Sequence, residues 1–471
     1  MSRFESRCAS FALACLLTAC LDAPPGVSAQ EQQHALHKPS AAAGKLLFEQ
    51  PLPHTNGRAC ATCHVLEEAT TLRPASVIER LRTQPDDPLF HPLDADDPNA
   101  AELSYEHLKK GLVRVVLRLP DNMDQIDFEG NVITSPDRKI FVWRGVPSVA
   151  DTAFTAPYQL DGRERTLESQ AQGAIINHSE GREASKRELA SIAQFQRSIF
   201  SSPRARLVAE LRELGVPEHK LPIPEEFFPL TEAQERGRVV YDAACRGCHG
   251  GATTDRIENP KLVEFLSPAF GPDGNVRYEV TPGRPPTPVR NARPGAIFMN
   301  AGFGALSYVA QLGLAPAFHA SVSLPRYRFR FYRDATRTEA LLDLPPVPVT
   351  ASGDPHDLRA ARDERGAPIV GPNLIPQQFT TDPGRAVITG DPADFEAFDV
   401  PQLRGIAHTA PYYHDNSLET LRAVIDEYSR FLLPFLEPLA LPKFPPEAPG
   451  GRPEALSPEQ KNDLLEFLEQ L

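Results

Sequence analysis

The sequence predicts a mainly α-helical fold with long irregular loops, arranged as two domains related by internal duplication. The motif C-x-x-C-H occurs twice, at Cys60–His64 and at Cys245–His249. The segments 146–167 and 400–421 align without a gap, and ten of their 22 residues are identical. Segments with helical patterning stand before the motifs and near the end of each unit, whereas strand patterns are few and scattered.

The predicted helices have recognisable start signals. Ser40 precedes the helical segment that leads to the first motif, and Thr231-Glu-Ala-Gln234 is a capping box before the second. Ser185-Lys-Arg-Glu188 opens the helix that closes the first unit. Ser457-Pro-Glu-Gln460 opens the helix that closes the second, with proline at the first helical position. We therefore expect each unit to contain an opening helix, a motif, a loop-rich wrap and a closing helix.

These signals divide the chain of 471 residues, which is longer than one core usually accommodates. Residues 203–230 contain five prolines and are interpreted as an interdomain linker. The predicted segments are a lipoprotein-type signal peptide at 1–19, a flexible tether at 20–39, an N-terminal domain at 40–202, the linker at 203–230 and a C-terminal domain at 231–471.

The N-terminus has the features of an export signal. Arg3 and Arg7 precede a short apolar run that ends in small residues. The stretch Leu17-Thr-Ala-Cys20 is similar to a bacterial lipoprotein box, which predicts that Cys20 is lipidated and starts the mature chain. The alternative is ordinary cleavage near Ala29. No other apolar run approaches the length of a membrane span, so we expect a periplasmic protein that contacts a membrane only through its lipid.

Composition narrows the class of partner. A hydrophobic content of 41% and a charged content of 24% are those of a soluble globular protein. The net charge of −13 argues against nucleic acid or an anionic membrane surface as a partner.

Cysteine usage indicates a cofactor. Of the seven cysteines, three fall in the predicted signal or at its cleavage point, and the other four form the two motifs. Two such motifs in an exported chain are typical of c-type haem, because both thiols add to the porphyrin edge and the histidine reaches the iron. A closed zinc site needs further Cys or His ligands, and a thioredoxin-like dithiol does not need the histidine. We predict two covalently bound c-type haems, attached through Cys60, Cys63, Cys245 and Cys248, with His64 and His249 as proximal iron ligands.

The motifs in their order resemble the bacterial dihaem cytochrome c peroxidase family, which includes the MauG-type enzymes. The stretches that carry the resemblance are GK-LF before the first motif, APYQLDGR after it, and VPQLRG with TAPYYHD after the second. The resemblance implies that both domains are cytochrome c-like. It covers roughly residues 40–200 and 230–471 and breaks down in 65–140 and 251–380.

The resemblance implies unequal roles for the two haems. Hydrogen peroxide would react at the N-terminal haem above His64, and the C-terminal haem above His249 would relay electrons. Glu168 stands at the position of the family's distal glutamate, which takes a proton from bound peroxide and returns it to the departing oxygen. The alternative interpretation of Glu168 is a surface glutamate of a helix.

Further residues are expected around the haems. The family's distal glutamine falls at Tyr158, so the chain departs from the family there, and Gln159 is adjacent. Arg163 is expected to pair with a haem propionate or with Asp161. Trp143 is a candidate electron relay between the haems, and a plain core residue is the alternative. In the second copy Tyr412 aligns with Tyr158, and His414 matches a histidine of the family that is normally not the ligand.

The axial ligands depart from the family. The relay haem normally carries Met or Tyr where this chain has Ala386, which cannot bind iron. Many members also hold a histidine on the reactive haem at rest, and only His91 and His107 are available for this role here. We lean towards an open, five-coordinate reactive haem. The candidate replacements on the relay haem are His408, His414, His319, His356 and Met299.

Three functions remain open at this point. The leading prediction is a cytochrome c peroxidase that takes electrons from a small cytochrome c or a cupredoxin. The alternatives are MauG-like oxidation of a partner protein or an organic substrate, and a non-catalytic dihaem electron carrier. The resemblance also implies a calcium ion, whose ligands the sequence does not locate, and a homodimer.

Overall fold

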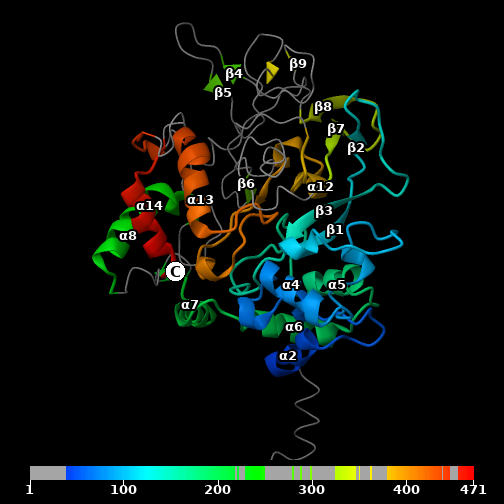
Figure 1. Ribbon diagram of the computed structural model, residues 1–471, viewed down its shortest axis with the longest axis horizontal. Coiled ribbons are helices and arrows are strands. Elements are labelled where there is room, and N and C mark those ends of the chain that lie inside the picture. Colours follow the sequence, from blue (N-terminus) through cyan, green and yellow to red (C-terminus); the bar gives the residue numbers. More distant parts are fainter. Residues whose placement is uncertain are drawn as a thin grey trace, which may run out of the picture.

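The computed structural model describes most of the chain and is mainly helical (Figure 1). Its described residues are 39–217, 220–221, 229–249, 324–345, 379–436, 439–445 and 454–471, with short strands at 278–279, 287–288, 298–299, 349–350 and 361–362. The predicted signal peptide, Cys20, His319 and His356 lie outside these residues. Among the helices of the described ranges, none combines the length and the apolar character of a membrane span.

The helices of the first unit follow the predicted order. A Ser40 side chain accepts a bond from the Ala43 amide at the start of the first helix, and the predicted capping box at Ser185 is present. The helices are α2 (Ala41–Glu49), α3 (Cys60–Cys63), α4 (Pro74–Thr83), α5 (Leu167–Asn177) and α6 (Lys186–Arg197), with 3₁₀ turns at Leu66–Glu68, Pro92–Asp94 and Leu108–Lys110.

The second unit also contains the predicted opening helix, motif and closing helix. Both predicted capping boxes, at Thr231 and at Ser457, are confirmed. The helices are α8 (Glu232–Ala244), α9 (Arg246–His249), α12 (Ala386–Thr389), α13 (Leu421–Glu427) and α14 (Pro458–Leu468). A π-helical turn follows at Tyr428–Leu432, and 3₁₀ turns lie at Pro392–Asp394, Ile406–His408 and Leu433–Phe435.

The predicted linker begins with helix α7 (Pro203–Glu213). Pro203, one of the prolines that suggested an irregular segment, stands at the first helical position after the Ser202 cap, where its missing N–H costs nothing. Ala205 and Val208 of α7 are buried against Phe154 of the first unit.

The opening and closing helices of each unit cross at a glycine. A Cβ built on Gly44 of α2 would lie 1.9 Å from the carbonyl oxygen of Ser191 in α6. A Cβ built on Gly237 of α8 would lie 2.0 Å from the carbonyl oxygen of Asp463 in α14. Both crossings therefore need glycine, because only glycine lets the two backbones approach this closely.

Most strands begin in the regions where the resemblance breaks down, 65–140 and 251–380, and β11 lies after the second region. Strands β1 (Leu112–Arg118) and β3 (Lys139–Gly145) form an antiparallel pair. Strands β2 (Met123–Ile126), β7 (Arg328–Tyr332) and β8 (Ala340–Leu344) form a second sheet in the order β2-β7-β8. The remaining described strands are β4 (Tyr278–Glu279), β5 (Thr287–Pro288), β6 (Phe298–Met299), β9 (Val349–Thr350), β10 (Ala361–Arg362) and β11 (Phe398–Asp399).

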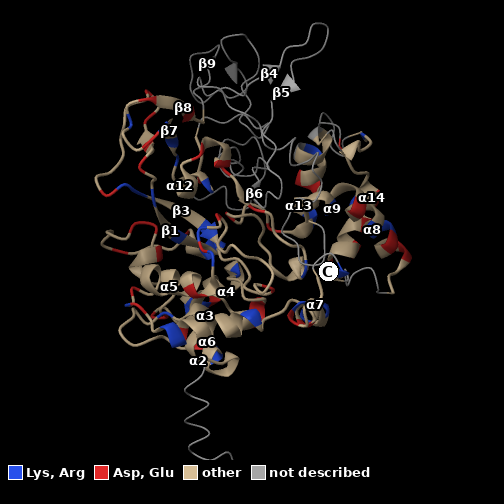
Figure 2. Ribbon diagram, turned by 180° about the vertical axis from the view of Figure 1, so that it is seen from behind, with Lys and Arg blue, Asp and Glu red and all other residues tan. Residues whose placement is uncertain are grey.

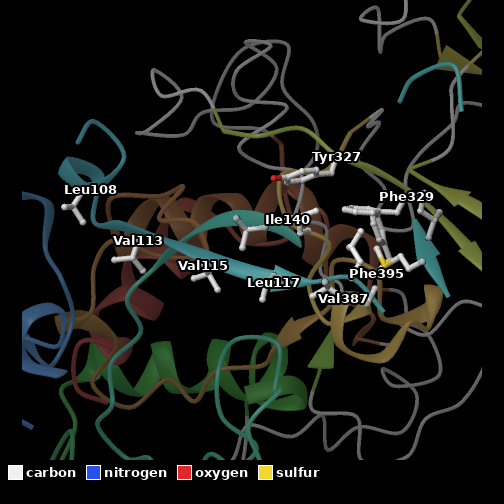
Figure 3. Packing of buried hydrophobic residues seen from close by; sticks show 14 of the residues in the cluster. Leu108, Val113, Val115, Leu117, Ile140, Tyr327, Phe329, Val387 and Phe395 are labelled. Atoms are coloured by element: carbon white, nitrogen blue, oxygen red, sulfur yellow. The ribbon is translucent and has the colours of Figure 1, made fainter. Parts of the chain in front are cut away.

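The second sheet joins the two units of the chain. Met123 of β2 stands opposite Phe331 of β7, so the strand before the first repeat segment pairs with one from the C-terminal half. An apolar core covers this junction, and Figure 3 shows Phe329, Val387 and Phe395 packed together beside the β1–β3 pair. Lys and Arg residues and Asp and Glu residues are interspersed along the described elements (Figure 2).

Candidate functional site

The first motif forms a short helix. Cys60–Cys63 make up α3, and the amide of His64 donates to the carbonyl of Cys60 at 2.9 Å. The Thr62 hydroxyl accepts from the amide of Ala59 at 3.0 Å and fixes the start of the turn. Burial raises the pKa of Cys60 to about 12 and that of Cys63 to about 11, so both thiols are neutral at neutral pH. The turn therefore presents two thiols and one imidazole from adjacent backbone.

The second motif is built the same way. Cys245 caps α8, and the amide of His249 donates to the carbonyl of Cys245 at 2.9 Å. Tyr241 of α8 donates its hydroxyl to the carbonyl of His249 at 2.7 Å, which ties the motif to the opening helix. Burial raises the pKa of Cys245 and of Cys248 to about 12.

The two imidazoles make the same kind of hydrogen bond. Nδ1 of His64 lies 3.0 Å from the carbonyl oxygen of Thr70, and Nδ1 of His249 lies 2.7 Å from that of Pro401. A carbonyl only accepts, so each Nδ1 carries the proton and each Nε2 offers a lone pair. Burial lowers the pKa of both rings and keeps them neutral.

This donor set fits a c-type haem. Neutral imidazoles that donate from Nδ1 to a carbonyl are the form in which histidine binds a metal through Nε2. The described residues hold no cluster of three or more His, Cys, Asp or Glu side chains suited to a metal ion, and the calcium ion stays a prediction.

The two aligned segments, 146–167 and 400–421, make matching hydrogen bonds. The amide of Tyr158 donates to the carbonyl of Glu164 at 2.6 Å, and the amide of Tyr412 donates to that of Leu418 at 2.7 Å. The hydroxyl of Tyr158 donates to the carbonyl of Thr152 at 3.1 Å, and that of Tyr412 donates to the carbonyl of Ile406 at 3.0 Å. Both tyrosines thus close a loop of their own unit.

Glu168 lies in the first turn of α5, where Thr166 caps the helix. Its carboxylate lies 3.4 Å from Arg197 of α6, and both side chains are partly exposed, at 36% and 43%. Within the described residues, no hydrogen bond joins Glu168 to His64. The helix dipole also favours a carboxylate in the first turn, which fits the alternative interpretation of Glu168 as a surface glutamate of a helix. The catalytic role of Glu168 therefore stays a prediction.

Arg163 pairs with Asp161, one of its two expected partners, at 2.6 Å. The same carboxylate oxygen of Asp161 accepts from Arg144 of β3 at 2.6 Å. Arg144 also makes two bonds to Asp382 of the second unit, at 2.7 and 3.0 Å. Sequence reasoning missed Arg144 and Asp382, since no local spacing links them.

Trp143 is buried and stacks on His107, with ring centroids 4.2 Å apart and an angle of 6°. Nδ1 of His107 lies 2.5 Å from Oδ1 of Asp96. His91 accepts from the Leu93 amide, and its Nε2 lies 3.4 Å from Glu180. Both histidines that were considered as resting ligands of the first haem therefore contact carboxylates.

The position of the missing relay ligand is apolar. Ala386 is fully buried in the core that holds Val387 and Phe395. His408 is exposed, and His414 stacks on Phe398 with centroids 4.1 Å apart. Nε2 of His414 is buried without a hydrogen bond among the described residues. The backbone of Met299 pairs with Phe398, so β6 runs beside this stack.

A comparison with known proteins supports the interpretation of the region that contains the first motif. Residues 38–202 match the family model described as di-haem cytochrome c peroxidase. The cytochrome-c peroxidase IdrP2 of Denitromonas iodatirespirans is 35% identical over 96 residues, which are 19% of this chain and 21% of that protein. The chain thus spans about a fifth of the length of this relative.

Solved structures with low identity are also similar. A MauG-like protein associated with microbial copper homeostasis is 18% identical, with a TM-score of 0.38 over 95% of this chain and 90% of that one. The diheme peroxidase BthA of Burkholderia thailandensis is 14% identical, with a TM-score of 0.34 over 91% and 84%. The match over residues 38–202 confirms the resemblance of this chain to the di-haem cytochrome c peroxidase family.

Proposed function

We propose that the chain is a dihaem c-type oxidoreductase that reacts with hydrogen peroxide at its N-terminal haem. Electrons would pass through the C-terminal haem, and a small cytochrome c or a cupredoxin would supply them. The single observation that carries the proposal is the pair of motif imidazoles, each donating from Nδ1 to a backbone carbonyl. The family match over residues 38–202 supports peroxide as the substrate of the first site.

When bound, each haem supplies the redox chemistry of its iron. The chain's part is to hold and orient it. Cys60, Cys63 and His64 would hold the first group, and the bond to Thr70 fixes the His64 ring and raises its basicity as a ligand. Cys245, Cys248 and His249 would hold the second in the same way, through Pro401.

Glu168 is the proposed proton carrier. A carboxylate beside peroxide accepts the proton of the proximal oxygen and returns it to the departing one. Arg197 of α6 lies 3.4 Å from this carboxylate.

Oxidation of a partner protein or an organic substrate is the second candidate. It is favoured by Ala386, whose burial in an apolar core leaves the family's usual ligand position without a donor. A relay haem with other axial ligands has a different reduction potential. This potential decides whether the second haem supplies electrons to the first or shares its oxidising equivalents. A non-catalytic carrier would instead require two closed haems.

We also infer that the two units arose by duplication and that the exported chain is anchored in the periplasm through Cys20. The equivalent glycine crossings at Gly44 and Gly237 support duplication. Metabolic labelling with a radioactive fatty acid tests the anchor. Label in the wild-type chain and its loss in Cys20→Ala are expected, whereas label retained in Cys20→Ala contradicts it.

Stopped-flow absorbance of the oxidised holoprotein mixed with peroxide tests the function. A change of the Soret band followed by its recovery on adding a reduced small cytochrome is expected. A Soret band that peroxide leaves unchanged contradicts the proposal.

A further inference from the structure

The carbonyl that accepts from His249 lies on a segment that the first unit holds. This carbonyl belongs to Pro401, and its oxygen lies 2.7 Å from Nδ1 of His249. The next residue, Gln402, donates from Nε2 to Oδ2 of Asp151 at 2.8 Å. Asp151 belongs to the first unit and is fully buried. The acceptor for the second proximal histidine is therefore adjacent in the chain to a hydrogen bond between the units.

Two further contacts hold the same segment. The amide of Asp399 donates to the carbonyl of Leu160 at 2.8 Å. A Cβ built on Gly405, which has φ +69°, would lie 2.8 Å from Cβ of Ser201. Both partners, Leu160 and Ser201, belong to the first unit. The segment that carries Pro401 is thus fixed against the first unit on both sides of this carbonyl.

Asp151 is itself held in place within the first unit. Ser201 donates its amide to Oδ1 of Asp151 at 3.1 Å and its hydroxyl to Oδ2. A buried carboxylate needs such donors, because water does not reach it. On the other side of the link, Oε1 of Gln402 is buried and has no hydrogen bond among the described residues. Within the described part of the chain, the bond from Nε2 to Asp151 therefore orients the Gln402 side chain.

The first unit supports its own proximal histidine from within. The alignment of the two segments places Ser148 where the second unit has Gln402. Oγ of Ser148 lies 3.0 Å from Oγ1 of Thr70, whose carbonyl oxygen lies 3.0 Å from Nδ1 of His64. The equivalent residue thus bonds inside its own unit, whereas Gln402 bonds to the other unit. The support of the two histidines is therefore asymmetric.

We propose that Asp151 and Gln402 are positioning residues for the second haem. Their hydrogen bond fixes the Pro401 carbonyl against His249. A firm bond from Nδ1 makes the imidazole a stronger electron donor, which favours ferric iron and lowers the reduction potential. The first unit thereby sets the potential of the second haem. The inference rests on the part of the proposed function that attaches a haem at each motif, and it does not depend on peroxide.

Spectroelectrochemical titration of the dihaem protein tests this inference. The wave of the second haem is the one that Cys245→Ala/Cys248→Ala removes. Gln402→Met keeps the size and the charge of the side chain but removes the donor. It is expected to raise the ratio of reduced to oxidised second haem at least tenfold, which is an upward shift of about 59 mV for one electron.

Asn122→Ala is the matched control. The amide of Asn122 also joins the two units, because Nδ2 donates to the carbonyl of Gly390 at 3.0 Å, but this bond does not adjoin Pro401. The control should leave the potential of the second haem unchanged. A role of Gln402 in stability alone would leave the potential unchanged in Gln402→Met as well, so the potential separates positioning from packing.

Asp151→Ala reaches the same bond from the first unit and should also raise the potential. Combining it with Gln402→Met should shift the potential no further than Asp151→Ala alone, because both changes remove one bond. This second variant decides the inference if Gln402→Met does not fold.

An unchanged potential in Gln402→Met, an equal shift in Asn122→Ala, or shifts that add in the double variant would each overturn the inference. The haemochrome spectrum counts the haems in every sample. If the wild-type protein carries two haems and the potential does not respond to Gln402→Met, the inference fails and the proposed function stands. If the wild-type protein carries no haem at the second motif, the proposed function fails and the inference fails with it.

Discussion

Arg144 of β3 holds Asp382 of the second unit through two hydrogen bonds, from Nε at 2.7 Å and from Nη2 at 3.0 Å. Both side chains are buried, and the remaining Nη1 donates to Asp161. Burial alone would lower the pKa of Arg144, but the charges of Asp382 and Asp161 outweigh it and raise the pKa. This ion network joins strand β3 and the segment of Asp161 to the segment before Ala386.

Arg144→Gln is expected to destabilise the holoprotein by about 3–5 kcal/mol, because it leaves two buried carboxylates without their cation. Urea unfolding followed by circular dichroism measures the change. Arg333→Gln is the control, since Arg333 and Glu339 form an exposed pair whose loss costs about 0–1 kcal/mol. An equal loss of free energy of unfolding in the two variants would contradict a stabilising role of the network.

Acid should weaken the fold through Asp96. Burial raises the pKa of Asp96, but hydrogen bonds from Glu106 and His107 outweigh it and lower the pKa from 3.8 to about 2. The folded pKa lies below the unfolded one, so the stabilisation is present above about pH 4 and is lost as the pH falls towards 2. Asp96→Asn should flatten the dependence of the free energy of unfolding on pH in this window. If the free energy of unfolding of Asp96→Asn depends on pH as steeply as that of the wild-type protein, the prediction is wrong.

Gly44→Ala and Gly237→Ala should each destabilise their unit by about 1–3 kcal/mol, since the new methyl group meets backbone that cannot move away. Gly173→Ala is the control, because the nearest atom to its Cβ lies at 3.4 Å in the side chain of Glu164. Alanine favours a helix interior over glycine, so this control should be neutral or stabilising. Thermal melts compare the three, and a neutral Gly44→Ala would show that the helices do not cross this closely.

Glu168→Gln should slow the reaction with peroxide by about 10²-fold or more while both haems stay attached, because the amide cannot carry the proton. Stopped-flow absorbance measures the rate, and the haemochrome spectrum counts the haems. Glu79→Gln removes an exposed helix carboxylate that pairs with Arg82 and serves as control. An unchanged rate in Glu168→Gln removes Glu168 from the mechanism.

Local signals in the sequence predicted the local structure. The serine and threonine caps at Ser40, Ser185, Thr231 and Ser457 all start helices, because each side chain satisfies an amide within three residues. The turn that carries each motif is local too, since the amides of His64 and His249 donate to the carbonyls of Cys60 and Cys245.

Contacts between distant segments could not be predicted in this way. The pairing of β2 with β7 and the link from Arg144 to Asp382 depend on how the two units meet, which no spacing in the chain encodes. The burial of Ala386 was missed as well. Ala386 packs with Val387 in the apolar core, and its position relative to the second haem stays a prediction.

We propose that the first haem reacts with peroxide while the second does not. Low-temperature electron paramagnetic resonance of the oxidised holoprotein before and after peroxide tests it most directly, with Cys60→Ala/Cys63→Ala and Cys245→Ala/Cys248→Ala as the variants. A high-spin signal that peroxide removes is expected in the wild-type protein and in the second variant, and is expected to be absent from the first. Two low-spin signals that peroxide leaves unchanged would contradict the account.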